Sequence, residues 1–343
     1  MMLWATCQPG LERVVRQELQ ALRLGPVVTA RPGLLRAGDV AGADGVTAAC
    51  RARTVDDLYL QIWSGHPEAF GALLAGPALT VPGELLAAHR AVLALTGRRP
   101  RGRIKTTSLL EGPLPFRRQD VEARLARLLL RAHPAWRLAE ERPDAEVVAF
   151  LSRESALVAL RLTDPSFRHR HYGRAPAALS PTVAAALVRL ARPSAEDRWL
   201  DPCCGGGTIL LERAQMGPYR LLLGGDASPA ALEVARANFG LRHQPWSLRV
   251  WDARALPLPD GSVDRVASNL PFGVQSPAAG GVGPFTAACL GEAARVLRPG
   301  GRAVLLWPLR PAVSPPPALS LEQEVAFTLV GQPVAARVFV REG

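Results

Sequence analysis

The chain of 343 residues is 48% hydrophobic and 21% charged, which excludes an intrinsically disordered protein and favours two or three globular domains. Its formal net charge of +11 favours nucleic acid as the partner, because basic side chains release the counterions that condense on phosphates. The five cysteines and six histidines lack the spacing of a disulfide framework or a metal site, and no signal peptide or membrane-spanning run is recognisable, so we expect a metal-free protein of the cytoplasm.

The first half of the chain mixes strands and helices without an internal repeat. A strand at 3–6, a Pro9-Gly10 turn and a helix over 11–22 predict a small α+β unit. The basic run 98–105, broken by proline and glycine, predicts a loop that is either a solvated segment or a contact for phosphates. The other expected strands are 55–63, 147–151 and 157–162, and the other expected helices are 82–95 and 119–132.

The second half, after a basic linker at 168–176, alternates strands and helices regularly. Repeated units of this length predict an α/β fold of the Rossmann-like type, in which helices cover both faces of a parallel sheet. Strands at 324–330 and 335–341 predict an antiparallel hairpin at the edge of that sheet. The expected helices are 181–191, 208–216, 229–239 and 285–297, and the expected strands are 198–200, 221–225, 247–250, 265–268 and 302–307.

A glycine-rich loop follows the first of these strands. Its glycines allow the backbone to approach a ligand at the carboxyl edge of the sheet, where ligands bind in open α/β folds. Asp201 precedes the glycines and can meet the sulfonium of S-adenosylmethionine directly or through water, whereas it would repel the pyrophosphate of NAD, which is the alternative cofactor. The loop reads Asp201, Pro202, Cys203, Cys204, Gly205, Gly206 and Gly207.

Two further acids follow the next two strands. Asp226, which precedes Ala227, is placed to accept hydrogen bonds from the ribose hydroxyls of an adenosine cofactor, and it can also serve as an acid at the start of a helix. Asp252, which precedes Ala253, is placed to accept from the exocyclic amine of adenine. The alternative for Asp252 is an ordinary turn residue.

The fourth motif, Asn269-Leu270-Pro271-Phe272, predicts the reaction. An aromatic amine is a poor nucleophile, and acceptors for its two N–H groups would make its lone pair available. The side-chain carbonyl of Asn269 and the backbone carbonyl of Leu270 can provide these acceptors, since Pro271 has no N–H and favours an extended backbone before it. Phe272 would stack on the base. The alternative is a simple Asn-x-Pro turn.

These four elements, in this order, resemble class I methyltransferases. The segments DPCCGGGTILLERA and SNLPFG look like the THUMP-domain tRNA guanosine-N2 methyltransferases in particular, and the opening ATCQPGLE is similar to the start of that family's ferredoxin-like domain. The resemblance implies a ferredoxin-like domain at 1–50, a THUMP domain at 51–165 that grips the acceptor end of tRNA, a linker at 166–180 and a methyltransferase domain at 181–343. It also implies S-adenosylmethionine as cofactor.

The leading hypothesis is therefore N2 methylation of guanosine in tRNA by a monomer. Methylation of an amine in ribosomal RNA or DNA remains an alternative, because Leu270 stands where many amine methyltransferases have proline. A non-catalytic RNA-binding protein is a third possibility, and the intact acids argue against it. The run 278–283 is either a lid over the substrate or a loop with no role. The expected cofactor contacts are Asp201, Cys203, Cys204, Gly205, Gly206, Gly207, Asp226, Ala227, Asp252, Ala253 and Asn269, and the expected catalytic residues are Asn269, Leu270, Pro271 and Phe272.

Overall fold

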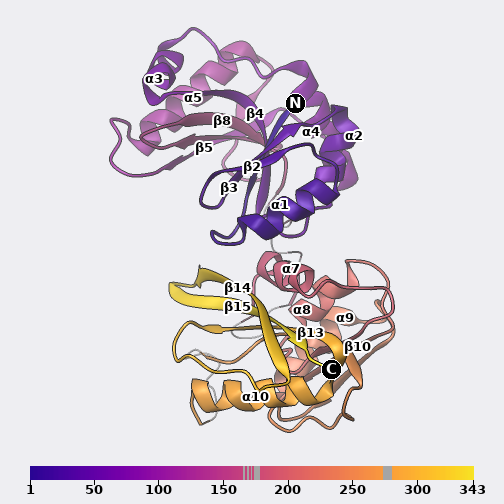
Figure 1. The fold of residues 1–343 in the computed structure, drawn as a ribbon. Helices are drawn as coiled ribbons and strands as arrows, with labels where there is room; N and C mark the ends of the chain where they lie inside the picture. The colour runs from indigo at the N-terminus through magenta and orange to yellow at the C-terminus, as the bar shows by residue number, and fades with distance from the viewer. Residues whose placement is uncertain (165–166, 168–169, 171, 174–177, 273–279) are drawn as a thin grey trace. The chain divides into compact units, whose positions relative to one another are not determined.

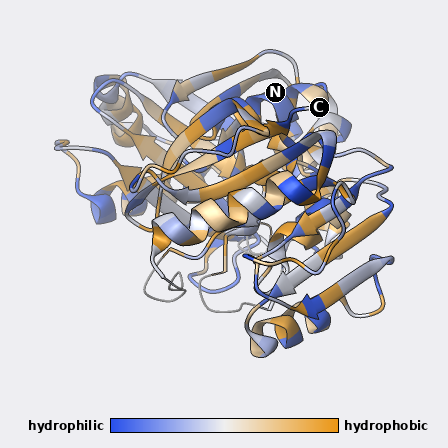
Figure 2. Ribbon diagram, turned by 60° about the horizontal axis from the view of Figure 1, so that its bottom comes forward, coloured by the Kyte–Doolittle hydropathy of each residue, from blue (hydrophilic) through white to orange (hydrophobic). Residues whose placement is uncertain are grey.

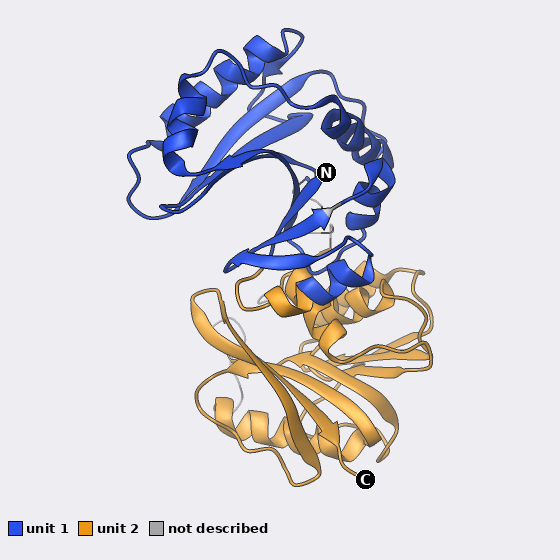
Figure 3. Cartoon of the chain, turned by 45° about the horizontal axis from the view of Figure 1, so that its top comes forward, with its two compact units in different colours: residues 1–7, 16–167 blue, residues 8–15, 168–343 orange. Residues whose placement is uncertain are grey.

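The computed structural model describes residues 1–164, 167, 170, 172–173, 178–272 and 280–343. The chain forms two compact units, shown in blue and orange in Figure 3. Unit 1 comprises Met1–Cys7 and Arg16–Phe167, and unit 2 comprises Gln8–Val15 and Arg168–Gly343. The predicted linker at 166–180 lies partly outside the described residues, and the domain boundaries at 50, 165 and 180 stay predictions.

Unit 1 contains an eight-stranded sheet with the order β2-β3-β1-β4-β8-β7-β5-β6. Strand β1 pairs antiparallel with both β3 and β4, so residues from either side of position 50 share one sheet. The strands are β1 (Met2–Thr6), β2 (Val27–Arg31), β3 (Leu34–Asp39), β4 (Asp57–Gly65), β5 (Arg103–Leu110), β6 (Arg137–Leu138), β7 (Ala145–Leu151) and β8 (Ala156–Arg161). The helices of this half of the chain are α1 (Glu12–Ala21), α2 (Gly42–Ala49), α3 (Pro67–Ala75), α4 (Gly83–Leu95) and α5 (Arg118–Ala132).

The expectation of a loop throughout 98–105 is corrected by β5, which begins at Arg103 and runs parallel to β7. Asp144 accepts hydrogen bonds from the backbone N–H of Arg101 at 2.6 Å and from the guanidinium of Arg103 at 2.9 Å. Lys105 forms an ion pair with Glu140 at 3.3 Å. The outer neighbour of β5 is only the two-residue β6, and polar residues occupy much of the length of β5. Its alternation of apolar and polar residues is therefore weak, and the sequence did not predict this strand.

Unit 2 contains a seven-stranded sheet with the order β11-β10-β9-β12-β13-β15-β14. The strands from β11 to β13 are parallel, and β15 lies antiparallel between β13 and β14. This is the expected parallel sheet with an antiparallel edge hairpin. The strands are β9 (Arg198–Asp201), β10 (Leu221–Asp226), β11 (Trp246–Val250), β12 (Val263–Asn269), β13 (Leu297–Pro308), β14 (Leu319–Leu329) and β15 (Gln332–Arg341). The helices are α7 (Pro181–Leu190), α8 (Thr208–Ala214), α9 (Pro229–Phe239) and α10 (Val282–Val296).

Helices cover both faces of the unit 2 sheet, with α7 and α8 on one side and α10 on the other (Figure 1). Trp199 and Leu200, successive residues of β9, lie in two different apolar clusters because alternate side chains of a strand point to opposite faces. The strands are mostly apolar, whereas the helices carry both apolar and polar residues (Figure 2), as expected where a sheet is buried on both faces. No helix in the described part of the chain is long and apolar enough to cross a membrane.

Candidate active site

The loop between β9 and α8 has the backbone that its glycines allow. Gly205 and Gly207 have φ values of 51° and 81°, in the left-handed region that other residues rarely adopt. A Cβ on Gly207 would lie 3.2 Å from the ring of Phe239 on α9, so a close approach also requires glycine there. At Gly205 a Cβ would have no described neighbour within 4 Å, so the space beside this residue is open to a ligand.

Asp226, the last residue of β10, fixes the glycine loop. Its Oδ2 accepts a hydrogen bond from the backbone N–H of Gly205 at 2.9 Å, and its Oδ1 accepts from that of Ser228 at 2.9 Å. Each carboxylate oxygen has a second lone pair, and the residue is half-buried, so it can still accept from the hydroxyls of a ligand. Ala227, which follows it, is exposed.

Trp251 is a site residue whose role the sequence did not reveal. Its indole Nε1 donates to the backbone carbonyl of Pro202 at 3.0 Å, and this hydrogen bond is buried. A Cβ on Gly225 would lie 1.9 Å from the Trp251 ring, so the ring occupies the space that any other residue at 225 would need. The end of β11 is thereby tied to both the glycine loop and β10.

Asn238 on α9 is a second contact that sequence analysis missed. Its Nδ2 donates to the backbone carbonyl of Gly206 at 2.9 Å and to that of Gly173 at 2.9 Å. Its Oδ1 accepts from the backbone N–H of Gly173 at 2.7 Å. No local pattern marks this residue, since a polar side chain near the end of a helix is normally solvated.

Asp252 lies beyond β11 with its carboxylate bound by Arg254. The two side chains approach to 2.7 Å, and the hydrogen bonds from Arg254 lower the pKa of Asp252. Both side chains are exposed, and the guanidinium carbon of Arg254 lies 5.9 Å from the centre of the Phe285 ring. Ala253 is buried beside them. An adenine amine at Asp252 would therefore share this carboxylate with Arg254 or displace the guanidinium.

Asp201 differs from the other acids because it points into the interior, with 1% of its surface exposed. Its Oδ1 accepts from the hydroxyl of Ser268 at 2.6 Å and from the backbone N–H of Cys203 at 3.2 Å. Burial raises the pKa of this carboxyl to about 7.

The two cysteines of the loop are neutral thiols. Hydrogen bonding with Cys289 and burial raise the pKa of Cys203 well above its ordinary value, and burial does the same for Cys204. Thiolates are the reactive form of cysteine, so these side chains contribute packing and not a nucleophile.

Asn269 is the last residue of β12 and lies opposite Leu306 of β13. Its side-chain Oδ1 is buried and accepts no hydrogen bond from the described part of the chain. The backbone N–H of Leu270 donates to the carbonyl of Leu306 at 3.0 Å, which fixes the strand end. Pro271 and Phe272 are half-buried, and Phe272 packs against the apolar cluster under α7 and α8. Gly273, which closes the motif, and residues 278–279 lie outside the described residues.

The strand order brings three of these residues to one edge. Strands β9, β10 and β12 are parallel, so Asp201, Asp226 and Asn269 all stand at carboxyl ends. Strands β10 and β11, which follow β9 in the sequence, lie on one side of β9 in the sheet, whereas β12 and β13 lie on its other side. Ligands in such sheets bind where the order reverses, which is between β9 and β12.

Comparison with known proteins shows the family. The model of the RMKL-like methyltransferase domain matches residues 168–315. The tRNA (guanine(6)-N2)-methyltransferase of Thermus thermophilus is 32% identical over 361 aligned positions, which cover 100% of this chain and 99% of that enzyme. The chain belongs to the guanine-N2 RNA methyltransferase family.

A solved structure that matches over the full length and a human enzyme that matches over part of the chain are also similar to this protein. The crystal structure of TrmN from Thermus thermophilus matches with a TM-score of 0.76 and 30% identity over 99% of both chains. The human U6 snRNA (guanine-N(2))-methyltransferase THUMPD2 is 32% identical over 194 positions, which cover 56% of this chain and 37% of that enzyme. The class I methyltransferase fold expected from the sequence is thereby confirmed.

A class I methyltransferase uses S-adenosylmethionine, and the site of this family member fits that cofactor. The space beside Gly205 is open to a ligand. At the adjacent strand end, Asp226 is half-buried and is held in place by the hydrogen bond from the backbone N–H of Gly205. Among the described residues, no three His, Cys, Asp or Glu side chains are grouped to hold a metal ion.

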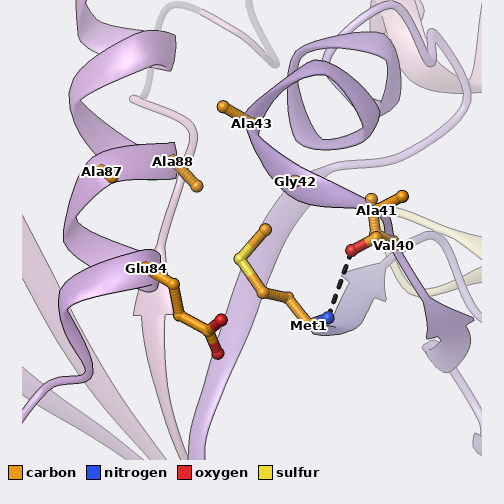
Figure 4. A pocket seen from close by; sticks show the side chains of 8 residues that line it. All are labelled: Met1, Val40, Ala41, Gly42, Ala43, Glu84, Ala87 and Ala88. Atoms are coloured by element: carbon orange, nitrogen blue, oxygen red, sulfur yellow. Dashed lines mark hydrogen bonds between the residues drawn. The ribbon is translucent and has the colours of Figure 1, made fainter.

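A pocket of unit 1 contains none of the predicted site residues. It lies between the start of α2 and α4, and small side chains such as Ala41 and Ala88 line it together with Met1 and Glu84 (Figure 4). The N-terminal ammonium of Met1 donates to the carbonyl of Val40 at 3.1 Å. All of the predicted cofactor and amine contacts are in unit 2.

Proposed function

We propose that this protein transfers a methyl group from S-adenosylmethionine to the exocyclic N2 amine of guanosine in tRNA, and that guanosine 6 is the position to test first. The observation that carries the proposal is the buried Oδ1 of Asn269, which accepts no hydrogen bond from the described residues and stands at the sheet edge where the cofactor loop begins. A buried acceptor without a donor costs free energy, so this atom is suited to an N–H group that a substrate brings. An exocyclic amine provides such a group.

Asn269 and Leu270 orient the amine in this proposal. The Asn269 Oδ1 accepts one N–H of the amine, and the Leu270 carbonyl accepts the other, which directs the nitrogen lone pair toward the methyl donor. S-adenosylmethionine supplies an electrophilic methyl group on a sulfonium centre. Phe272 stacks on the base, while Pro271 maintains the turn without an N–H that would compete. Rate acceleration then comes mainly from orientation in a dry site and not from a strong base.

The loop and strand ends hold the cofactor. Asp226 accepts from the ribose, with Ala227 beside it, and the backbone of Gly205, Gly206 and Gly207 allows close approach. Cys203 and Cys204, which belong to the same loop, contact the cofactor as neutral thiols. Asp252 and Ala253 lie at the adenine end of the cofactor. There Arg254 either shares the Asp252 carboxylate with the adenine amine or moves away from it. The half-buried Asp226 and the exposed Ala227 support this assignment.

Unit 1 is proposed to contain the ferredoxin-like and THUMP domains and to bind the tRNA. Its helix α5 carries Arg124, Arg127 and Arg131 on exposed positions. Guanidinium groups in such a row suit phosphate contacts, which position the RNA without reading its sequence. The monomeric state and the cytoplasmic location stay predictions.

The relatives differ in the RNA that their names give. The enzyme that matches over the full length acts on tRNA by its name, whereas the human relative that matches over about half of this chain acts on U6 snRNA. The full-length match favours tRNA, because it includes unit 1. Ribosomal RNA or DNA as substrate, and a non-catalytic RNA-binding protein, are the alternatives to be tested.

Mass spectrometry of nucleosides from tRNA incubated with the protein and S-adenosylmethionine tests the proposal. We expect N2-methylguanosine from unmodified tRNA and none from the same tRNA with inosine at position 6, because inosine lacks only the 2-amino group. Methylation that persists with inosine at position 6 would reject that position. N6-methyladenosine as the only product would reject the base, and product from DNA or ribosomal RNA alone would reject tRNA.

A further inference from the structure

Ser268 joins the two halves of the site. It lies in β12 directly before Asn269, and Asp201 ends β9, the parallel strand beside it. The Ser268 hydroxyl donates to Asp201 Oδ1 at 2.6 Å, and neither residue exposes more than 1% of its surface. The same oxygen accepts from the backbone N–H of Cys203, the second residue after Asp201 in the glycine loop. One carboxylate oxygen thus connects the cofactor loop to the strand that presents Asn269.

The groups around Asp201 make the Ser268 hydroxyl important for stabilising the charge of this carboxylate. The charged group that acts on Asp201 from β10 is the carboxylate of Asp226, which opposes ionisation. The loop contributes the thiols of Cys203 and Cys204, both neutral. Neutral donors must therefore stabilise the charge, and those described are the Ser268 hydroxyl and the Cys203 N–H.

We propose that Ser268 is a positioning residue for methyl transfer: its hydroxyl stabilises the ionised form of Asp201 and sets the separation between the glycine loop and the Asn269 carbonyl. The inference rests on the proposed role of Asn269 in binding the amine. Loss of the hydroxyl would leave Asp201 protonated in the neutral range, because one of its two described donors would be gone. The glycine loop and the Asn269 turn would then lose this hydrogen-bonded connection and stay joined by strand pairing and by the apolar cluster that contains Leu200 and Leu270, with Cys203 packed against it.

Calorimetric titration of the full-length protein with S-adenosylmethionine, which carries the sulfonium that Asp201 is predicted to meet, from pH 5.5 to 9 tests the first part without any RNA. In the wild-type protein, affinity should fall on acidification with a midpoint near the pKa of about 7 that burial gives Asp201. Ser268→Ala should move this midpoint upward by roughly one pH unit or more and weaken binding at pH 7 by about tenfold, as for a lost hydrogen bond to a charged group. Ser268→Thr, which retains a hydroxyl, should restore the midpoint.

The matched control is Ser108→Ala, because Ser108 is also a fully buried strand serine that donates to a carboxylate, that of Glu122 at 3.0 Å in unit 1. It should leave the midpoint unchanged. If Ser268→Ala does not fold, Asp201→Asn should abolish the pH dependence. A wild-type midpoint in Ser268→Ala, or an undiminished pH dependence in Asp201→Asn, overturns the proposal.

Turnover at saturating cofactor and RNA tests the second part. Ser268→Ala should lower kcat by about tenfold or more at pH 8.5 or above, where affinity for S-adenosylmethionine recovers, since the Asn269 turn remains misplaced. A wild-type kcat there would overturn the positioning role. If the wild-type protein makes no N2-methylguanosine, the proposed function fails, while the binding titration still decides whether Ser268 controls Asp201.

Discussion

Asp201 is a carboxylate buried without a described basic partner, and its effect on folding has a definite sign. Its pKa is about 7 in the folded protein, against 3.8 for the ordinary group. Between these values the folded state holds a proton that the unfolded state has lost, so the stability of the wild-type protein falls as the pH rises from about 4 to about 7.

Asp201→Asn should therefore stabilise the protein at pH 8 by roughly 1 to 4 kcal/mol relative to the wild type, although it impairs function. The side-chain oxygen of asparagine can still accept from Ser268 and Cys203. Urea denaturation at pH 5 and pH 8 measures this effect. The advantage of the variant should be smaller at pH 5, and an equal difference at both pH values would show that the charge of Asp201 is not its source.

Asn269→Ala separates catalysis from cofactor binding. The variant should lose turnover by at least roughly a hundredfold, as for a deleted transition-state partner, while its affinity for S-adenosylhomocysteine stays within about threefold. Asn238→Ala should show the opposite pattern, since Asn238 holds the carbonyl of Gly206 in the cofactor loop. Steady-state kinetics and calorimetry on both variants check this prediction. A near-normal rate in Asn269→Ala would remove Asn269 from the mechanism.

At the scale of elements, the glycine loop, β10 and β11 are held together by one indole ring. Trp251→Phe keeps an aromatic ring but removes the N–H that Pro202 accepts. We expect S-adenosylhomocysteine to bind about tenfold more weakly, in keeping with a lost buried hydrogen bond that leaves a carbonyl unpaired. Unchanged affinity would mean that the loop keeps its shape without this bond.

The contact between Gly225 and Trp251 can be tested by a double-mutant cycle. Gly225→Ala should strongly destabilise the wild-type protein, because its methyl group would lie 1.9 Å from the indole. The same substitution in a Trp251→Ala background should cost much less, because the obstructing ring is gone. Thermal unfolding of the four proteins measures the coupling, and additive effects would contradict it.

At the scale of the whole molecule, the net charge of +11 predicts that RNA binding weakens as salt increases. Reversing Arg124 and Arg127 to glutamate on α5 should raise the KM for tRNA by about tenfold at 0.15 M salt and leave kcat unchanged, because phosphate contacts position the substrate. Arg51→Glu with Arg153→Glu changes the net charge equally at other exposed positions of unit 1. Equal effects of the two double variants would mean that overall charge and not α5 attracts the RNA.

The sequence alone predicted the α/β order, the edge hairpin and the motifs at the strand ends. Hydrophobic periodicity and glycine or proline turns are local properties, so they can be recognised in any short stretch of chain. The parallel sheet then implied that Asp201, Asp226 and Asn269 meet at one edge, since carboxyl ends of parallel strands coincide. The family followed from the same motifs in the same order.

Folding in three dimensions was needed to learn what each side chain touches at that edge. Asp201 turns inward to Ser268, Arg254 binds Asp252, and the Trp251 ring excludes any side chain at Gly225. These contacts join residues that come from different strands or depend on the path of a turn, and no periodicity encodes them. Their energies arise from burial and short-range packing, which exist only once the strands have become neighbours.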